Sequence, residues 1–394
     1  MFLCVLLLAA HDFPAQAWDV EISGNVAAEA RVFFQSARLP EQGDASGSLS
    51  LKPEFYSEWN NSADSLLLVP FVRLDQNDRR RTHADVRELT YVHAARAWEL
   101  RVGARRVFWG VAESNHLVDI INQTDLIEDP DGEDKFGQPM VNLALNQDWG
   151  TVDLFVLPGI HERSFPGRDG RLQAPLPVDV DRPRFESPAG DKHIDYALRY
   201  AHTLGPIDIG LAHFWGTSRE PRLVLAHTAK GRPELRPFYD LINQTSLDLQ
   251  ATLGSCAFKL EALRRAGQGE TYAAAVGGFE YTFVGVFGSA VDLGLLGEYH
   301  YDERGARATT PFNHDVFVGS RVSLNDAADS QILGGVVVDV KGGGEFFNLE
   351  AGRRLGDNWR LDLELRLLID IAPRDAFYSI NRDDYLQLEV SRFF

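Results

Sequence analysis

The chain ends with two segments, DNWRLDLELRLLID at residues 357–370 and YLQLEVSRFF at residues 385–394. In a β-strand, successive side chains point to opposite faces. The odd positions of the first segment are aliphatic: Leu361, Leu363, Leu365, Leu367 and Ile369. The even positions are charged: Arg360, Asp362, Glu364 and Arg366. This alternation, followed by a strand that ends on Phe394, is typical of a wall with lipid outside and water inside. A soluble antiparallel sheet over a core alternates in the same way.

The composition excludes several classes of protein. The chain has 394 residues, a formal net charge of −18 and 44% hydrophobic residues. Its longest apolar run, residues 2–10, is shorter than the roughly 20 residues that a membrane-spanning helix needs. The acidic balance argues against nucleic acid as a partner, because that partner selects basic surfaces.

The first 17 residues have the features of a secretory signal peptide. An apolar stretch is followed by Ala15-Gln-Ala17, which places cleavage before Trp18. Residues 18–394 would then form one domain. Cys4 would leave with the signal, and Cys256 alone can form no internal disulfide.

About eighteen segments alternate with a period of two and are separated by turn residues. They lie near residues 20–35, 48–59, 65–75, 84–94, 97–108, 140–148, 150–157, 193–203, 206–215, 244–253, 255–264, 270–283, 290–301, 313–324, 330–340, 345–355, 358–369 and 383–394. The sequence therefore predicts an all-β fold, a closed antiparallel transmembrane barrel of about 18 strands.

The connections between these segments differ in length in a regular way. Every second connection is tight, whereas the others include residues 109–139, 158–192 and 216–243. Short periplasmic turns and long extracellular loops are typical of bacterial outer-membrane barrels. Trp59, Trp98, Trp149 and Trp359 lie beside short turns, and Trp109 and Trp215 lie where strands enter long loops. We expect these rings to form two girdles at the membrane interfaces.

With Phe394, the alternation and the loop asymmetry, the chain resembles the single-chain porins and export channels of Gram-negative outer membranes, such as the alginate-export and substrate-specific porin types. Arg392 departs from the apolar or aromatic residue usual in such terminal strands. The resemblance implies residence in the bacterial outer membrane and passive passage of small polar or charged solutes. It also implies the lipid bilayer, lipopolysaccharide and the barrel-assembly machinery as partners, and no cofactor.

Charged residues of both signs fall on the predicted inner face of the strands. The predicted pore-lining set is Arg101, Arg105, Arg199, Lys259, Glu261, Arg321, Glu350, Asp362, Glu364 and Arg366. Such charges either stabilise the wall through ion pairs or set the selectivity of a water-filled pore, and the two roles are compatible. A soluble core could not accommodate so many charges.

The connection 109–139 is the candidate constriction. Leu117, Ile120 and Ile121 recur at helical spacing and predict a short amphipathic helix folded into the lumen, with an outward loop as the alternative. Its predicted constriction residues are Asp119, Asp125, Glu128, Asp129 and Asp131. The excess of acidic over basic residues in this connection predicts a mild cation preference of the pore, opposed by Arg101 and Arg105 on the adjoining strand.

Two further hypotheses concern metal and catalysis. Asp129, Asp131 and Glu133 surround a glycine turn and could hold a structural Ca²⁺, although a solvated acidic turn has the same residues. No serine motif accompanies the scattered histidines, so we expect no enzyme; a barrel hydrolase is the unfavoured alternative. A plugged structural or adhesin-like barrel is the other alternative to a channel.

Overall fold

The protein is an antiparallel β-barrel of 18 strands in a computed structural model that describes residues 19–373 and 375–394. The barrel strands are β1 (Glu21–Phe33), β2 (Ala45–Trp59), β3 (Asp64–Asp75), β4 (His83–Ala94), β5 (Trp98–Arg105), β6 (Gln138–Gln147), β7 (Gly150–Pro158), β9 (Ile194–Leu204), β10 (Ile207–Thr217), β13 (Leu241–Leu253), β14 (Cys256–Gly267), β15 (Gly269–Phe283), β16 (Asp292–Asp302), β17 (His314–Ser323), β18 (Gln331–Asp339), β19 (Glu345–Leu355), β20 (Trp359–Ile369) and β21 (Tyr385–Phe393). Each of the eighteen predicted segments coincides with one of them, which confirms the predicted fold.

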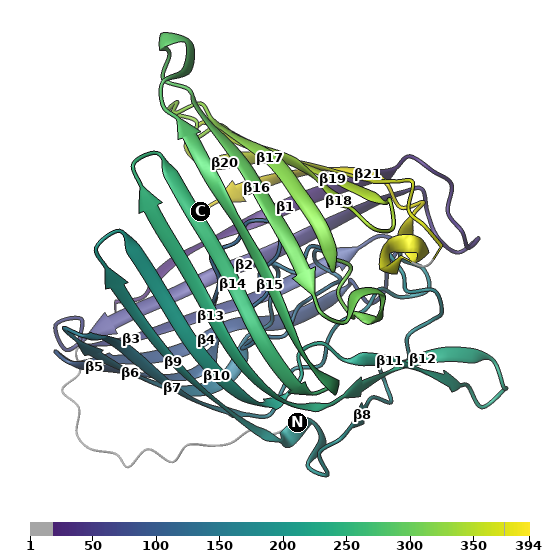
Figure 1. Cartoon of the computed structure of the whole chain (residues 1–394), viewed down its shortest axis with the longest axis horizontal. Coiled ribbons are helices and arrows are strands. Elements are labelled where there is room, and N and C mark those ends of the chain that lie inside the picture. The colour runs from purple at the N-terminus through teal and green to yellow at the C-terminus, as the bar shows by residue number, and fades with distance from the viewer. Residues whose placement is uncertain (1–18, 374) are drawn as a thin grey trace.

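The first and last strands close the barrel. β1 pairs with β21 from Asn25 opposite Phe393 to Phe33 opposite Tyr385, and it pairs with β2 on its other edge. Every other barrel strand pairs with the strands before and after it in the sheet (Figure 1). Closure leaves no free sheet edge, so the backbone donors and acceptors of the strands are satisfied within the wall.

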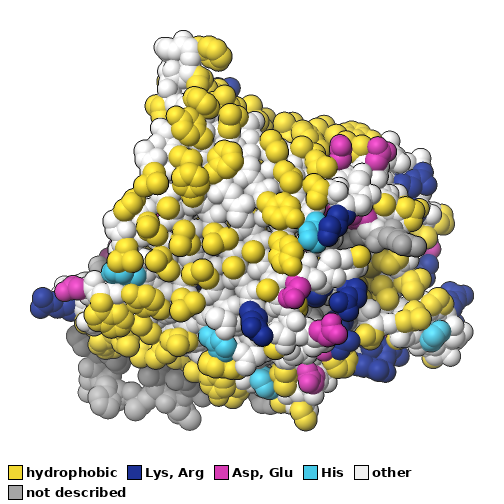
Figure 2. Space-filling view, viewed as in Figure 1, with side chains coloured by type: hydrophobic (Ala, Val, Ile, Leu, Met, Phe, Trp, Pro, Cys, Tyr) yellow, Lys and Arg dark blue, Asp and Glu magenta, His cyan; other side chains and the backbone are white. Residues whose placement is uncertain are grey.

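The facing of the side chains follows the predicted alternation. In β20, Glu364, Arg366 and Leu368 are buried inside the barrel, whereas Leu365 and Ile369 lie on the outer face. Figure 2 shows hydrophobic side chains spread over the outside of the strands, with charged side chains gathered at the end that carries the long connections. An apolar outer belt and a charged inner face are what a lipid-facing barrel requires.

The two ends of the barrel differ as predicted, with two corrections. At the short-turn end, Gly254 and Gly356 have φ of +63° and +69°, a conformation that glycine adopts without steric cost. At the other end, the connection after β10 is not a plain loop, because it contains the hairpin of β11 (Arg222–His227) and β12 (Pro233–Tyr239). The connection after β7 adds β8 (Arg184–Phe185), parallel to β12, so the two connections share a small sheet (Figure 1).

Of the six tryptophans predicted to form girdles, four are exposed on the outer surface near the barrel ends, Trp59 is half-buried against Tyr91, and Trp109 is buried. Trp98, Trp149, Trp215 and Trp359 are between 38% and 54% exposed, whereas Trp109 is only 3% exposed. Trp109 contacts Phe155 edge-to-face, with ring centroids 5.8 Å apart, inside the barrel. The prediction of a girdle position for Trp109 was wrong, because the chain turns into the lumen directly after β5.

The predicted signal peptide at residues 1–17 lies outside the described residues. Among the residues that the structure describes, no helix has both the length and the apolar character needed to cross a membrane.

Candidate pore constriction and lumen cavities

Residues 106–137, which connect β5 to β6, lie inside the barrel. They contain no helix, contrary to the predicted amphipathic one. Their backbone donors are used by the barrel wall instead of by a helix: Val111, Ala112 and Val118 donate to Glu261 on β14, at 2.6, 2.8 and 3.0 Å. A segment whose amide groups find acceptors on a distant strand gains nothing by forming its own helical hydrogen bonds.

A second carboxylate anchors the segment two strands further along the wall. Glu298 on β16 accepts from the backbone of Glu113, at 2.7 Å, and of Ser114, at 2.9 Å. Ser114 Oγ also donates to Glu298 and lies 2.9 Å from His300 Nε2. His300 Nδ1 has no hydrogen-bond partner among the described residues, so no acidic group orients this imidazole as in a nucleophilic triad. The contact is an anchor that the sequence alone did not reveal.

On the opposite side of the lumen, arginines from β3 and β4 and the connection between them bind buried carboxylates. Arg73 bridges Glu128 at 2.8 Å and Glu29 on β1 at 3.0 Å, and Arg81 binds the same Glu29 at 2.6 Å. The guanidinium of Arg87 lies 2.8 Å from Asp125. Burial makes such pairs costly to break from one side, because an unpaired charge is left behind. We refer to Glu29, Arg73, Arg81, Arg87, Asp125 and Glu128 as the arginine latch.

Aliphatic side chains of the segment complete the attachment. Val118, Ile120 and Ile121 are at most 2% exposed and pack against Phe155 and Phe214 on the inner wall. Of the three residues with helical spacing, Ile120 and Ile121 belong to this group, and Leu117 packs against Leu263 and Tyr272 on the wall. Their burial, and not a helix, explains why an otherwise polar connection carries aliphatic residues.

The tip of the segment, residues 129–133, contacts β20. The carboxylates of Asp129 and Asp131 each lie 2.9 Å from Arg366 Nη2. Glu133 contacts His116 at 3.5 Å. Burial raises the pKa of Asp129 to about 7 and also raises that of Asp131, while the hydrogen bond with His116 lowers the pKa of Glu133. The predicted calcium turn thus contacts a guanidinium, which supplies positive charge where the ion would lie.

Among the described residues, one group of ligand atoms is close enough for a metal ion, and it is not the predicted calcium turn. His83, Asp125 and Glu128 place one ligand atom each within 4.8 Å of one another. Asp125 and Glu128 belong to the arginine latch, where the guanidinium groups of Arg87 and Arg73 bind them. A cation would have to compete with them, and we do not assign a metal here.

The five predicted constriction residues divide into two groups. The side chains of Asp119, Asp125 and Glu128 are 1%, 0% and 5% exposed, so they are attachment points that cannot present charge to a solute. Asp119 pairs with Lys135 at 3.3 Å, and burial raises its pKa. Asp129 and Asp131 remain accessible at the tip, at 17% and 24%. Periodicity could not separate these groups, because their partners lie on distant strands.

The predicted pore-lining residues are all on the inner wall, and half of them line an open part of the lumen. The half that lines the cavities described next comprises Arg321, Glu350, Asp362, Glu364 and Arg366. The other half lines neither of them: Arg101, Arg105, Arg199, Lys259 and Glu261. Glu261 is covered by the segment.

The side chains of Arg101 and Arg105, which were expected to oppose the charge of the acidic segment, bind residues of the barrel wall instead. Both arginines contact Asn142 on β6, at 2.8 and 3.2 Å, and Arg101 also pairs with Glu99 and Asp153 within the wall. Arg199 likewise pairs with Asp248 at 2.7 Å. The acidic segment draws its partners from β3, β4 and β20 instead.

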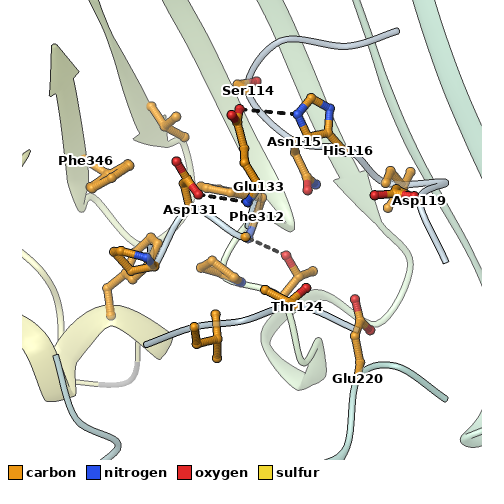
Figure 3. A pocket seen from close by; sticks show the side chains of 18 of the residues that line it. Ser114, Asn115, His116, Asp119, Thr124, Asp131, Glu133, Glu220, Phe312 and Phe346 are labelled. Carbon is orange, nitrogen blue, oxygen red and sulfur yellow. Dashed lines mark hydrogen bonds and ion pairs between the residues drawn. The ribbon is translucent and has the colours of Figure 1, made fainter. Parts of the chain in front are cut away.

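Two cavities flank the tip of the segment. The cavity toward the long connections, which we call the upper cavity, has a volume of about 380 Å³. The cavity toward the short turns has a volume of about 480 Å³. Both are lined by Asp131, Glu133, Leu333 and Glu350. In Figure 3, Asp131 and Glu133 project beside the upper cavity, with Phe346 on the left and His116 on the right. The tip therefore stands between two open spaces along the β17–β20 wall.

Comparison with known proteins gives similarity in structure alone. No protein-family model matches the chain, and no curated protein matches its sequence. Wzi of Escherichia coli, described as an outer-membrane protein involved in group 1 capsule assembly and a carbohydrate-binding β-barrel, is 10% identical, with a TM-score of 0.50. The match covers 93% of this chain and 83% of Wzi.

Two other outer-membrane barrels resemble the chain less closely. OmpT of Vibrio cholerae is 9% identical with a TM-score of 0.48, over 97% of this chain and 99% of OmpT. A mutant of the Rh. blastica porin is 10% identical with a TM-score of 0.48, over 95% of this chain and all of the porin. At such identities the comparisons concern the fold alone: the chain has the architecture of an outer-membrane β-barrel.

Proposed function

We propose that the protein is an outer-membrane channel for the passive passage of small polar solutes, narrowed by residues 106–137. The observation that carries the proposal is the pair of cavities on either side of the tip, which share Asp131, Glu133, Leu333 and Glu350 as lining residues. A barrel that only anchors or displays its loops would not need open space above and below one short turn.

The route in this proposal follows the β17–β20 wall. The other side of the lumen is closed by the arginine latch and by the packing of Val118, Ile120 and Ile121. Firm attachment on that side holds the tip at a fixed distance from Arg366. The width of the passage is then set by a rigid element and not by a mobile loop.

The charges at the tip favour weak ion selectivity. Asp129, Asp131 and Glu133 face Arg366 and His116, so much of the acidic excess predicted from the sequence is balanced locally. The accessible carboxylate of Glu133 leaves a small cation preference. Reversal potentials in a salt gradient measure this preference directly.

A barrel that binds a carbohydrate without passing it is the second candidate, because Wzi, whose fold this chain shares, is described as carbohydrate-binding. Its supporting observation is that residues 106–137 are attached on both sides of the lumen, at β14 and β16 and at β3 and β4. No catalytic role is part of either candidate.

Planar-bilayer conductance of the purified protein separates the two candidates. We expect discrete conductance steps, and larger ones in the double variant Asp131→Ala with Glu133→Ala, which trims the tip between the cavities. Asp169→Ala is the matched control, because this carboxylate pairs with the exposed Arg79 in the outer connections. The absence of steps from both the parent protein and the tip variant would overturn the channel and leave the closed binding barrel.

A further inference from the structure

The upper cavity has an apolar wall, which is unexpected inside a polar lumen. Its apolar lining from β17–β20 and the adjoining connections comprises Phe312, Phe317, Leu333, Val337, Phe346 and Phe377. The ring of Phe377 stacks on Phe346 at 5.4 Å between centroids and meets Phe312 edge-on at 6.0 Å. The stacked pair of Phe346 and Phe377, with Phe312 edge-on to Phe377, forms the aromatic platform at the side of the cavity.

Two glycines make room for the aromatic side of this wall. A Cβ atom at Gly335 would lie 2.3 Å from the Phe317 ring, and one at Gly319 would lie 2.6 Å from it. Any larger residue at either position would push Phe317 out of its place against β17 and β18. The apolar wall is therefore specified by the small residues beside it and is not a chance grouping.

Polar atoms without hydrogen-bond partners line the same cavity. His116 Nδ1 and Asn348 Oδ1 are buried and have no hydrogen-bond partner among the described residues. A buried polar atom without a partner is costly, and a ligand hydroxyl that reached it would remove that cost. Figure 3 shows Asn115 and His116 across the cavity from Phe346.

All but one of the basic groups that line the cavity, within the described part of the chain, are already in ion pairs. Arg304 binds Asp302 at 2.7 Å, Arg265 binds Glu220 at 2.7 Å, and Arg366 binds the tip. Of the basic residues that line this cavity within the described part of the chain, Arg163 alone has no ion pair; its Nε donates to Gln123 at 3.2 Å. A neutral ligand can use the free groups without displacing any of these pairs.

From these features we infer that the upper cavity is a binding site for a neutral, hydroxylated ring compound, of the size of a mono- or disaccharide. The inference rests on the proposed function and names the solute class of that channel. A sugar ring has an apolar face that fits the platform of Phe312, Phe346 and Phe377, and equatorial hydroxyls that reach Asn115, His116 and Asn348. A volume of about 380 Å³ accommodates one or two such rings.

Trehalose, a neutral disaccharide, is the probe that tests the site, by calorimetric titration of the purified protein and by block of its current. Phe346→Ala and Asn115→Ala should each weaken binding about tenfold, the upper end of what one aromatic or hydrogen-bond contact contributes. Phe258→Ala is the matched control, because this ring is 48% exposed on the outer face of β14. Conductance without sugar should stay unchanged in Phe258→Ala.

The charged probes glucuronate and benzoate separate the alternatives. If either anion bound more tightly than trehalose and Arg163→Gln abolished that binding, the inferred neutral ligand would be wrong and the site would bind an anion at Arg163. Dextran that blocks as well as trehalose would identify the end of a polymer as the natural source of the ring. Equal trehalose binding by the parent and both site variants would overturn the site. A protein that binds trehalose yet conducts no current would overturn the channel and leave the site standing.

Discussion

Glu261 is the attachment point whose removal should release residues 106–137 most directly. Its side chain is fully buried, and one carboxylate oxygen accepts from Val111 and Ala112 while the other accepts from Val118. In Glu261→Gln, the amide oxygen can keep the first two bonds, but the amide nitrogen faces the N–H of Val118. Two charge-assisted bonds become neutral ones, and one buried donor loses its acceptor.

The magnitude follows from these three bonds. Each bond that loses its charge assistance costs about 1 kcal/mol, and the orphaned donor costs about 1–3 kcal/mol. Removal of a buried charge offsets part of this sum, so the expected loss of attachment free energy is about 2–4 kcal/mol. That loss raises the detached fraction of the segment about 30- to 1,000-fold, since each 1.4 kcal/mol is a factor of ten.

Limited trypsin digestion and conductance report the detachment. Cleavage after Lys135 should accelerate in Glu261→Gln, and conductance should become larger or noisier. Glu389→Gln is the matched control, because Glu389 lies on the inner face of β21 and is hydrogen bonded only by Ser391 among the described residues, at 3.0 Å. Unchanged cleavage and conductance in Glu261→Gln would refute the role given to this carboxylate.

Three further results are expected. Leu365→Arg on the outer face should cost about 2–4 kcal/mol in unfolding free energy near the bilayer midplane. Glu364→Arg should also destabilise the barrel, since Glu364 is buried and accepts hydrogen bonds from Gln387 at 3.3 Å and from Tyr385. Urea titrations in detergent measure both losses. Arg73→Met should lower the unfolding free energy by about 3–5 kcal/mol, because Glu128 loses the guanidinium that binds it. A second change, Glu128→Gln, should restore part of that stability. Simple addition of the two losses would contradict the pairing of Arg73 with Glu128 in the arginine latch. Because burial raises the pKa of Asp129 to about 7, the attached tip holds a proton that a detached tip releases between about pH 4 and 7. Attachment of the segment should therefore strengthen as pH falls through this range, and protection of Lys135 from trypsin measures this change. Asp129→Asn should flatten the pH dependence.

The facing of individual side chains was predictable only in part. The sequence placed Glu364 on the inner face, as one of the residues predicted to line a water-filled pore. The structure instead buries Glu364 between Tyr385 and Arg366. Alternation reports which face a residue is on, whereas the contents of the lumen at that depth depend on chain segments far away in sequence.

The eighteen strands, their facing and the unequal lengths of their connections were predictable from local sequence. These are local properties: a strand between lipid and water must alternate every two residues, and a tight hairpin needs turn residues at its own position. Leu361 to Ile369 show this in nine residues.

The course of residues 106–137 depends instead on contacts with distant parts of the chain. Val111 and Ala112 bond to a carboxylate about 150 residues away, and Asp131 contacts an arginine 235 residues away. No periodicity within the segment encodes such partners, so a helix was predicted where there is none, and Trp109 was placed in a girdle. Barrel closure brings these strands around one lumen, and the long-range charges, amides and aliphatic contacts on its wall then fix the path of the segment.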